Sequence, residues 1–203
     1  MDGEQQGVVM GSLIRFDPES HTYTVNGNVV PNVTSILKPL YSYSGVNRQV
    51  LDDAAERGKN VHKICEMEMY GILDESSVHE EYAGYLSAFR KFIKNTGFQP
   101  NLIEHRVYHE RLNYAGTIDI EGCFPGRMEA EDIIDIKTTA KFMPSVGPQT
   151  MAYKKARGVK DKRFALQLKA NADFNLVELK DDARDWSVFV SCLNVLNFMQ
   201  VKK

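Results

Sequence analysis

Hydrophobic residues recur along the chain in two patterns, one typical of helices and one typical of strands. In 47–70 and 77–95 apolar residues return every three or four positions, which predicts two amphipathic helices. In 102–110, 114–123 and 131–138 apolar and β-branched residues form short runs bounded by turn residues, which predicts three consecutive strands. The chain therefore places a pair of helices before a group of strands.

The segments on either side continue both patterns. Asn26-Gly27 stands between two β-type runs and is a strong hairpin signal. Gly58 lies inside the first helical pattern and predicts a break or a close packing contact there. The order predicts an α/β fold in which a central mixed β-sheet is flanked by helices and preceded by an N-terminal β-hairpin. The remaining predicted elements are strands at 13–16, 22–25 and 29–30, a short helix at 33–37, a loop at 38–46, a helix at 148–158, a strand pair at 163–170 and 173–179, and a final helix at 182–199.

Length and composition predict one domain with an ordinary core. The 203 residues are read as a flexible leader (1–12) and a single domain (13–203). With 25 basic and 27 acidic residues there is no global positive field, so any binding of nucleic acid must rest on a local cluster. Three widely separated cysteines argue against a disulfide framework and for a reducing cytoplasm. Without a signal peptide or a long apolar run, we expect no membrane association.

The candidate chemistry begins on the strand at 131–138. Alternation along a strand places Asp135 and Lys137 on one face and Ile134 and Ile136 on the other. A carboxylate beside an ammonium on so apolar a strand is either a surface ion pair or part of an active site. A second motif of this kind, Glu178-Leu179-Lys180, adjoins an acidic run and is interpreted as a solvated strand end.

An acidic strand lies just upstream, at 114–122, where Gly116 precedes Asp119. The turn residues Pro125-Gly126 predict that this strand and the next are antiparallel neighbours, which brings Asp119 towards Asp135. Carboxylate oxygens are the ligands that Mg²⁺ prefers. A nearby lysine can orient water or stabilise charge on a phosphate. Together these groups can hydrolyse a phosphodiester with the help of a metal.

Two helical pairs add to this set, although each alone is ordinary. His62 and Glu66 are four positions apart and so share one helical face, as do Gln149 and Tyr153. Neither pair by itself indicates a site, because a polar stripe or a packed helical face has the same spacing. The histidines outside the 57–66 helix, His21 among them, have no partner at metal-ligand spacing. We therefore assign them structural roles.

Taken together and in this order, these residues resemble the RecB-type branch of the PD-(D/E)xK nuclease superfamily. The branch pattern is G-x-x-x-H, then G-x-x-D, then (D/E)-x-K, then Q-x-x-x-Y. The resemblance covers about 57–155, and the opening segment from Phe16 to Leu37 also looks like the start of bacteriophage-encoded members. The matching pairs are Gly58 and His62, Gly116 and Asp119, Asp135 and Lys137, and Gln149 and Tyr153.

The resemblance implies a restriction-endonuclease-like core and a role for each matching residue. Lys137 would position or activate the attacking water, while Gln149 and Tyr153 would hold the DNA strand or order the site. Isoleucine stands before Asp119 where the superfamily has proline. The cysteines that hold an iron–sulfur cluster in some relatives have no counterpart, so we expect none. The implied ligands for Mg²⁺ or Mn²⁺ are His62, Asp119, Asp135 and the backbone carbonyl of Ile136, with Glu66 a weaker candidate.

The function implied is that of a metal-dependent DNA exonuclease in phage-type recombination, repair or DNA processing. Its substrate would be linear double-stranded or single-stranded DNA, its partner an annealing or replication protein, and its location the cytoplasm, that of the host cell if the protein is viral. The alternatives are a structure- or sequence-specific endonuclease on the same fold and a catalytically inactive DNA-binding relative. The predicted phosphate-binding rim comprises Lys141, Lys154, Lys155, Arg157, Lys160, Lys162 and Arg163, faced by Arg48, Arg57, Lys59 and Lys63.

Overall fold

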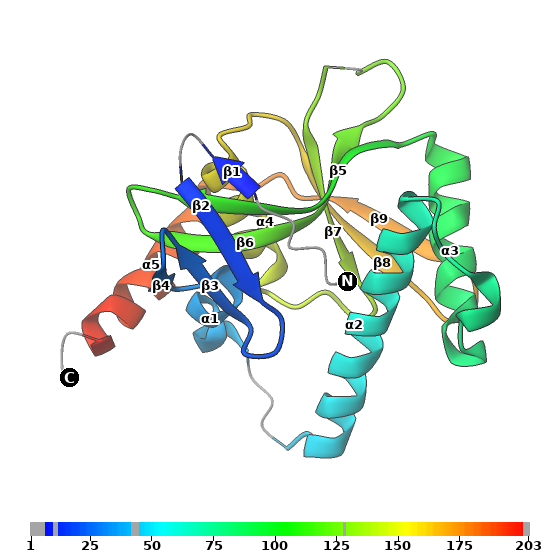
Figure 1. The fold of residues 1–203 in the computed structure, drawn as a ribbon, viewed down its shortest axis with the longest axis horizontal. Helices are drawn as coiled ribbons and strands as arrows, with labels where there is room; N and C mark the ends of the chain where they lie inside the picture. The colour runs from blue at the N-terminus through cyan, green and yellow to red at the C-terminus, as the bar shows by residue number, and fades with distance from the viewer. Residues whose placement is uncertain (1–6, 10–11, 42–44, 128, 201–203) are drawn as a thin grey trace.

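In the computed structural model, which describes residues 7–9, 12–41, 45–127 and 129–200, the chain forms two β-sheets and two layers of helices (Figure 1). The strands are β1 (Gly7–Val9), β2 (Ser12–Asp17), β3 (Thr22–Val25), β4 (Asn28–Val30), β5 (Gln99–His109), β6 (Tyr114–Cys123), β7 (Asp132–Lys137), β8 (Arg163–Leu168) and β9 (Phe174–Glu178). The α-helices are α1 (Val33–Ile36), α2 (Arg48–Met69), α3 (Glu80–Thr96), α4 (Val146–Arg157) and α5 (Asp182–Gln200), with 3₁₀ turns at Lys38–Leu40 and Glu75–Ser77.

The N-terminal sheet is antiparallel and runs in the order β1-β2-β3-β4. The predicted hairpin is confirmed at Asn26-Gly27, where both residues have positive φ (50° and 83°), as a two-residue hairpin turn requires. Within 1–12, predicted as a flexible leader, the structure describes 7–9 and Ser12. The first of these segments forms β1, because the β-branched pair Val8-Val9 extends the exposed edge of β2. The rest of that leader lies outside the described residues.

The second sheet is mixed and runs in the order β5-β6-β7-β8-β9. Neighbouring strands are antiparallel except β7 and β8, which are parallel and joined through α4. The predicted turn between β6 and β7 is confirmed: Arg127 N donates to Phe124 O (3.0 Å) across Pro125-Gly126. Gly126 has φ 81°, the conformation that the third position of a type II turn needs. The expected mixed sheet with flanking helices is therefore confirmed.

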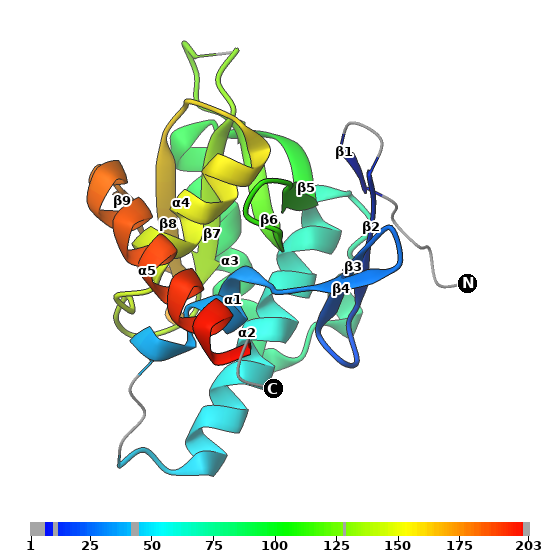
Figure 2. The same cartoon turned by 90° about the vertical axis from the view of Figure 1, so that its left-hand side faces the viewer.

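Helices cover both faces of the mixed sheet (Figure 2). Ile134 and Ile136 of β7 pack with α2 and α3, whereas Ile133 packs on the other face with α1, α4 and α5. A strand covered on both sides reads as a nearly continuous apolar run, as β7 does. Because Asp135 and Lys137 alternate with Ile134 and Ile136, they share the face of Ile133, in agreement with the prediction.

Helix α2 is continuous from its cap at Asn47, whose side chain accepts from Gln49 N, to Met69. Neither alternative predicted at Gly58 is correct. The helix does not break there, and an added Cβ would meet only Thr138 Oγ1, at an ordinary 3.8 Å. In Figure 1 the first half of α2 extends beyond the body of the protein, whereas its second half packs against the sheet.

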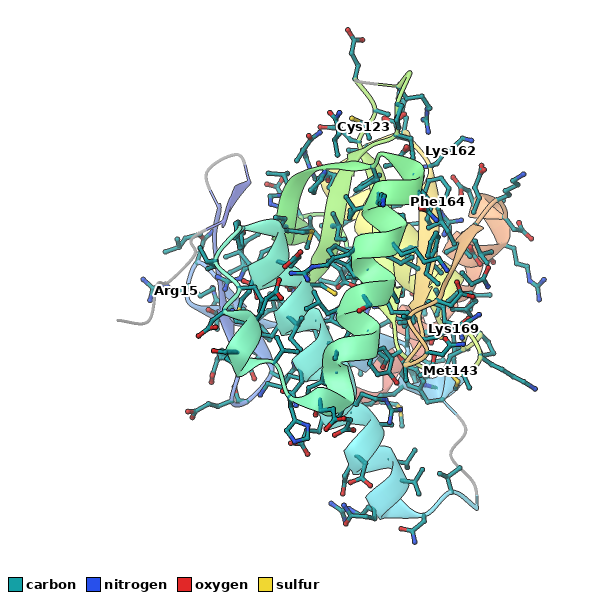
Figure 3. All side chains as sticks on the ribbon, turned by 90° about the vertical axis from the view of Figure 1, so that its right-hand side faces the viewer. Arg15, Cys123, Met143, Lys162, Phe164 and Lys169 are labelled. Atoms are coloured by element: carbon teal, nitrogen blue, oxygen red, sulfur yellow. The ribbon has the colours of Figure 1, made fainter. Side chains whose placement is uncertain are left out.

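Helix α3 lies across the sheet, in front of Phe164 of β8 (Figure 3). In the same view the N-terminal sheet, marked by Arg15, lies on the opposite side of α2 from β8 and β9, so α2 has sheet on both flanks. The predicted start of α3 at residue 77 is corrected to Glu80, after a 3₁₀ turn, because His79 caps the helix by accepting from Glu81 N. Among the described residues, no helix is both long and apolar enough to cross a bilayer.

Candidate active site

Strands β6 and β7 separate at the point where the candidate acids lie. Their last paired residues are Ile120 and Ile134. One residue beyond, Asp119 Oδ2 accepts a hydrogen bond from Ile136 N at 2.6 Å, so a side chain takes the place of the next strand contact. The arrangement holds Asp119 beside Asp135 on the neighbouring strand. The predicted approach of these two strands is confirmed.

His62 reaches this point from α2. Its Nε2 lies 3.0 Å from the carbonyl oxygen of Ile136, and its Nδ1 lies 3.6 Å from Asp119 Oδ1. Both side chains remain partly accessible, at 28% for His62 and 12% for Asp119. Three of the groups predicted as metal ligands thus converge on one accessible point.

Glu104 joins this cluster, although the sequence patterns did not single it out. One ligand atom each from His62, Glu104 and Asp119 lie within 4.8 Å of one another. Glu104 has a φ of 49°, unusual for a residue with a side chain, and it interrupts the β5–β6 ladder between Ile103 and His105. Burial, and then the charges of Asp119 and Glu66, raise the pKa of Glu104 to about 8. The charges of Lys63 and Arg106 offset this increase in the pKa only in part.

Asp135 and Lys137 form a buried pair directly beside the cluster. Lys137 Nζ lies 2.6 Å from Asp135 Oδ2, and Asp135 is only 1% exposed. Burial raises the pKa of Asp135, and the lysine charge offsets this in part. Burial alone lowers the pKa of Lys137, but the charges of Asp135 and Asp119 outweigh it and the pKa lies above its ordinary value. Lys137 is therefore an ammonium at neutral pH, suited to stabilise negative charge rather than to accept a proton.

The donor set fits a hard divalent cation. Within the described part of the chain, Asp135 Oδ1 has no hydrogen-bond donor and Oδ2 has only the Lys137 ammonium group beside it, although both oxygens are buried. Leaving such oxygens unsatisfied is unfavourable. A cation beside Asp119 and Glu104 would compensate them, and carboxylates with one imidazole and a backbone carbonyl suit Mg²⁺ or Mn²⁺.

Helix α4 carries Gln149 and Tyr153, which line the same cavity as Asp119. The side-chain amide of Gln149 donates to the Tyr153 hydroxyl at 3.0 Å, and Tyr153 is only 4% exposed. Its ring packs on Gly116, where an added Cβ would lie 2.6 Å from Tyr153 Cε1 and 3.1 Å from Val33 Cγ2. Of the two predicted roles for this pair, ordering the site fits the burial of the ring better than gripping DNA.

The contact between Gly116 and Tyr153 leads to a prediction about stability. Gly116→Ala should destabilise the fold by about 1–3 kcal/mol, because a methyl group there overlaps a packed ring. Gly58→Ala is the matched control: its methyl group has room, and alanine favours a helix. Urea denaturation of both variants measures the difference. Equal midpoints for the two would show that the ring yields without cost.

A cavity of about 810 Å³ opens onto the cluster. His62, Glu66, Glu104, Asp119 and Gln149 all line it, so the predicted Glu66 is beside the site, where it accepts from Lys63 at 2.9 Å. Its walls are α2 on one side and the N-terminal sheet on the other.

Most of the predicted basic rim is paired with acids. Arg163 is fully buried and bonded to Asp182 and Asp185, so it does not belong to a surface rim. Lys155 lies over the ring of Trp186, and Lys141 is exposed. A DNA contact at these positions stays a prediction, whereas the lysines that line the cavity in the described chain are Lys59 and Lys63. The remaining pairs are Lys154 with Asp182 (2.8 Å), Arg157 with Glu121 and Glu131 (3.0 and 3.1 Å), Lys162 with Glu178 (3.2 Å) and Arg48 with Asp52 (3.8 Å).

No known protein-family model matches the chain, and a search of curated protein sequences finds no match either. The residues of the cluster and their geometry are therefore the basis for assigning a function.

Proposed function

We propose that the protein is a metal-dependent DNA nuclease of the RecB-type branch of the PD-(D/E)xK superfamily. The observation that carries the proposal is the convergence of His62, Asp119 and the Ile136 carbonyl beside the buried Asp135–Lys137 pair. These groups come from α2, β6 and β7. The motifs of the family occur along the chain in this same order. Glu104 adds a carboxylate to the same cluster.

Each residue then has a chemical task. His62, Asp119, Asp135, Glu104 and the Ile136 carbonyl would hold one or two Mg²⁺ or Mn²⁺ ions. A bound ion of this kind supplies Lewis acidity and lowers the pKa of water. Lys137, kept cationic by Asp135, holds the attacking water or the charge that builds up on the phosphate. Asp135 fixes the position of that ammonium group.

The buried pair on α4 supports the catalytic residues indirectly. The hydroxyl of Tyr153 is held by Gln149, and its ring packs on the glycine of β6 that lies three residues before Asp119. This contact fixes the position of β6 relative to α4. Gln149 and Tyr153 are therefore positioning residues in the proposal; both line the cavity, and both are largely buried.

We favour an exonuclease over the two alternatives. A sequence-specific endonuclease reads base edges with side chains presented to a groove. The cavity wall on α2 offers Lys59 and Lys63, which suit phosphates, whereas the amide of Asn60 beside them already donates to the Tyr82 hydroxyl at 2.9 Å. An inactive DNA-binding relative would have no chemical use for the intact Asp119, Asp135 and Lys137. Degradation of DNA ends suits phage-type recombination or repair, and an annealing or replication protein is the partner we propose for that work.

The choice between exonuclease and endonuclease leads to a test on DNA ends. Linear DNA labelled at its 5′ or 3′ end should be degraded progressively with Mg²⁺, and covalently closed circles should resist. If Lys59 and Lys63 supply two phosphate contacts, binding should weaken roughly five- to tenfold from 50 to 200 mM salt. Discrete, reproducible bands from closed circles would favour the endonuclease and leave the proposed metal site standing.

The cluster also leads to a test of its two glutamates. Glu104→Gln should raise the Mn²⁺ concentration needed for half-maximal cleavage by roughly tenfold or more, because glutamine cannot ionise and so cannot supply the carboxylate ligand that Glu104 becomes on losing its proton. Glu66→Gln should have a smaller effect, since Glu66 is already paired with Lys63. A metal titration of both variants, with His62→Ala alongside, ranks the ligands. A larger effect at Glu66 would show that the cation lies nearer to α2.

A further inference from the structure

The wall of the cavity opposite α2 carries aromatic side chains from the N-terminal sheet. Phe16, His21 and Tyr23 all line the cavity that contains Asp119 and His62. The Phe16 ring lies 5.1 Å from the His21 ring, nearly perpendicular to it, and 4.6 Å from the Tyr23 ring. We call Phe16 and His21 the aromatic wall.

This wall is fixed to the strand that carries the candidate metal ligand. Tyr23 is buried, and its hydroxyl lies 2.7 Å from Thr117 Oγ1, two residues before Asp119. Ala115 N, on the same strand, donates to Pro31 O at 2.9 Å just beyond β4. The sheet and β6 are therefore joined at two places on either side of Gly116. A site on such rigid elements holds its groups at defined positions.

The two rings of the wall remain partly accessible, unlike Tyr23, and the Arg106 guanidinium lies over the Phe16 ring at 6.0 Å from its centre. Phe16 is half-buried, and His21 is exposed at the end of the β2–β3 turn. Asp17 fixes this turn by accepting from Glu19 N (3.0 Å) and Ser20 Oγ (2.6 Å). His21 itself has a positive φ of 52°, a conformation that histidine and asparagine tolerate better than most residues. Partial burial lowers the pKa of His21, so the imidazole is uncharged at neutral pH.

The opposite wall carries charge instead of rings. Lys59 and Lys63 of α2 line the cavity one helical turn apart, and Glu66 on the same wall pairs with Lys63 at 2.9 Å, which leaves Lys59 as the ammonium group without that partner. Rings on one side and ammonium groups on the other form the arrangement by which proteins bind single strands, with bases stacked and phosphates neutralised. A volume of about 810 Å³ is in the range of small-ligand sites, so the cavity itself can take part of one strand.

We propose that an unpaired base at the end of the DNA strand being cut packs on the aromatic wall, stacking on one ring and meeting the other, perpendicular ring at its edge, with its phosphates towards Lys59 and Lys63. The inference rests on the proposed nuclease function and deepens it: the strand enters the site unpaired, and the N-terminal sheet determines that preference. Stacking accepts any base, so the wall selects for a free strand and not for a sequence.

The test uses variants that remove a ring while keeping its local structure. Phe16→Leu keeps an apolar side chain, and His21→Asn keeps a residue that tolerates positive φ. Val29→Ala is the control, because Val29 lies on the same sheet, is 71% exposed and does not line this cavity. Melting curves establish that all three are folded.

The probe is a short single-stranded oligonucleotide with the fluorescent base 2-aminopurine at its end, bound with Ca²⁺ in place of Mg²⁺ to slow cleavage. The wild-type protein and Val29→Ala should quench the fluorescence by stacking. Phe16→Leu and His21→Asn should each lose most of the quenching and bind roughly 5- to 100-fold more weakly. The wild-type protein should bind an oligonucleotide that lacks the terminal base as weakly as these variants bind the intact one.

The outcomes separate the two proposals. If the wild-type protein cleaves DNA with Mg²⁺ while both ring variants bind and quench like Val29→Ala, the stacking wall is overturned and the nuclease stands. If the wild-type protein neither binds nor cleaves any DNA with Mg²⁺ or Mn²⁺, the nuclease itself is overturned.

Discussion

Asp119→Asn should abolish DNA cleavage, by at least about 10³-fold, while the protein stays folded. The amide oxygen of asparagine can still accept the hydrogen bond from Ile136 N, which holds β6 against β7. The amide nitrogen must then occupy the place of Asp119 Oδ1, 3.6 Å from His62 Nδ1. A group with two N–H donors there repels a cation. The change therefore removes the proposed metal site and leaves the backbone contact in place.

Cleavage rates of the two proteins at several Mg²⁺ concentrations, with urea denaturation alongside, measure this effect. Asp52→Asn is the matched control, because Asp52 lies on the exposed part of α2 and pairs only with Arg48 in the described structure. The control should behave like the wild-type protein in both measurements. Wild-type rates for Asp119→Asn would mean that the cation, or the whole reaction, lies elsewhere.

Lys137→Ala should retain metal and DNA binding and lose roughly 10²–10³ in the rate of cleavage. The ammonium group acts on the water or on charge that develops during the reaction, so its loss affects the transition state more than the bound substrate. It also leaves Asp135 buried without its partner, which should lower the stability of the metal-free protein. Bound Mg²⁺ should restore part of that stability by compensating the carboxylate.

Single-turnover cleavage at saturating Mg²⁺ and DNA separates this chemical defect from weaker binding. Lys180→Ala is the control, since Lys180 belongs to the other acid–x–lysine motif of the chain and is exposed after β9. Its partner in the motif, Glu178, is paired with Lys162. Loss of activity in Lys180→Ala, with Lys137→Ala unaffected, would show that the wrong motif was chosen.

Elements with a strong local pattern were predictable from the sequence. Strand β6 occupies the predicted 114–123, and the predicted helix at 47–70 is α2 within one residue at each end. Other features depend on more than the pattern of one short segment. Val8 and Val9 become a strand only because β2 offers an edge, and α2 continues through Gly58 because one weak helix former does not break a long helix.

The site was predictable where its residues follow a linear motif. Asp119, Asp135, Lys137 and His62 were expected together, and the structure places them together. Glu104 was missed, because its role depends on a backbone conformation inside β5 that no local pattern specifies. The only sign in the sequence was that Glu104 is an acid directly after the apolar pair Leu102-Ile103.

The pairing of the basic rim with acids could not be predicted locally, for a related reason. The run around Lys154 and Arg157 gives no sign of the acids that neutralise it, which come from β6, α5 and the segment before β7. Likewise His21 was assigned a structural role, since no ligand partner lies near it in sequence. Its place beside Phe16 on the cavity wall depends on how the N-terminal sheet packs against β6.

The most direct test of the central claim is cleavage of end-labelled linear DNA by protein stripped of metal with EDTA, before and after Mg²⁺ or Mn²⁺ is added. The account predicts no cleavage in EDTA and full recovery with either ion, with no recovery for Asp119→Asn. Undiminished cleavage in EDTA, or none with any divalent cation, would contradict it.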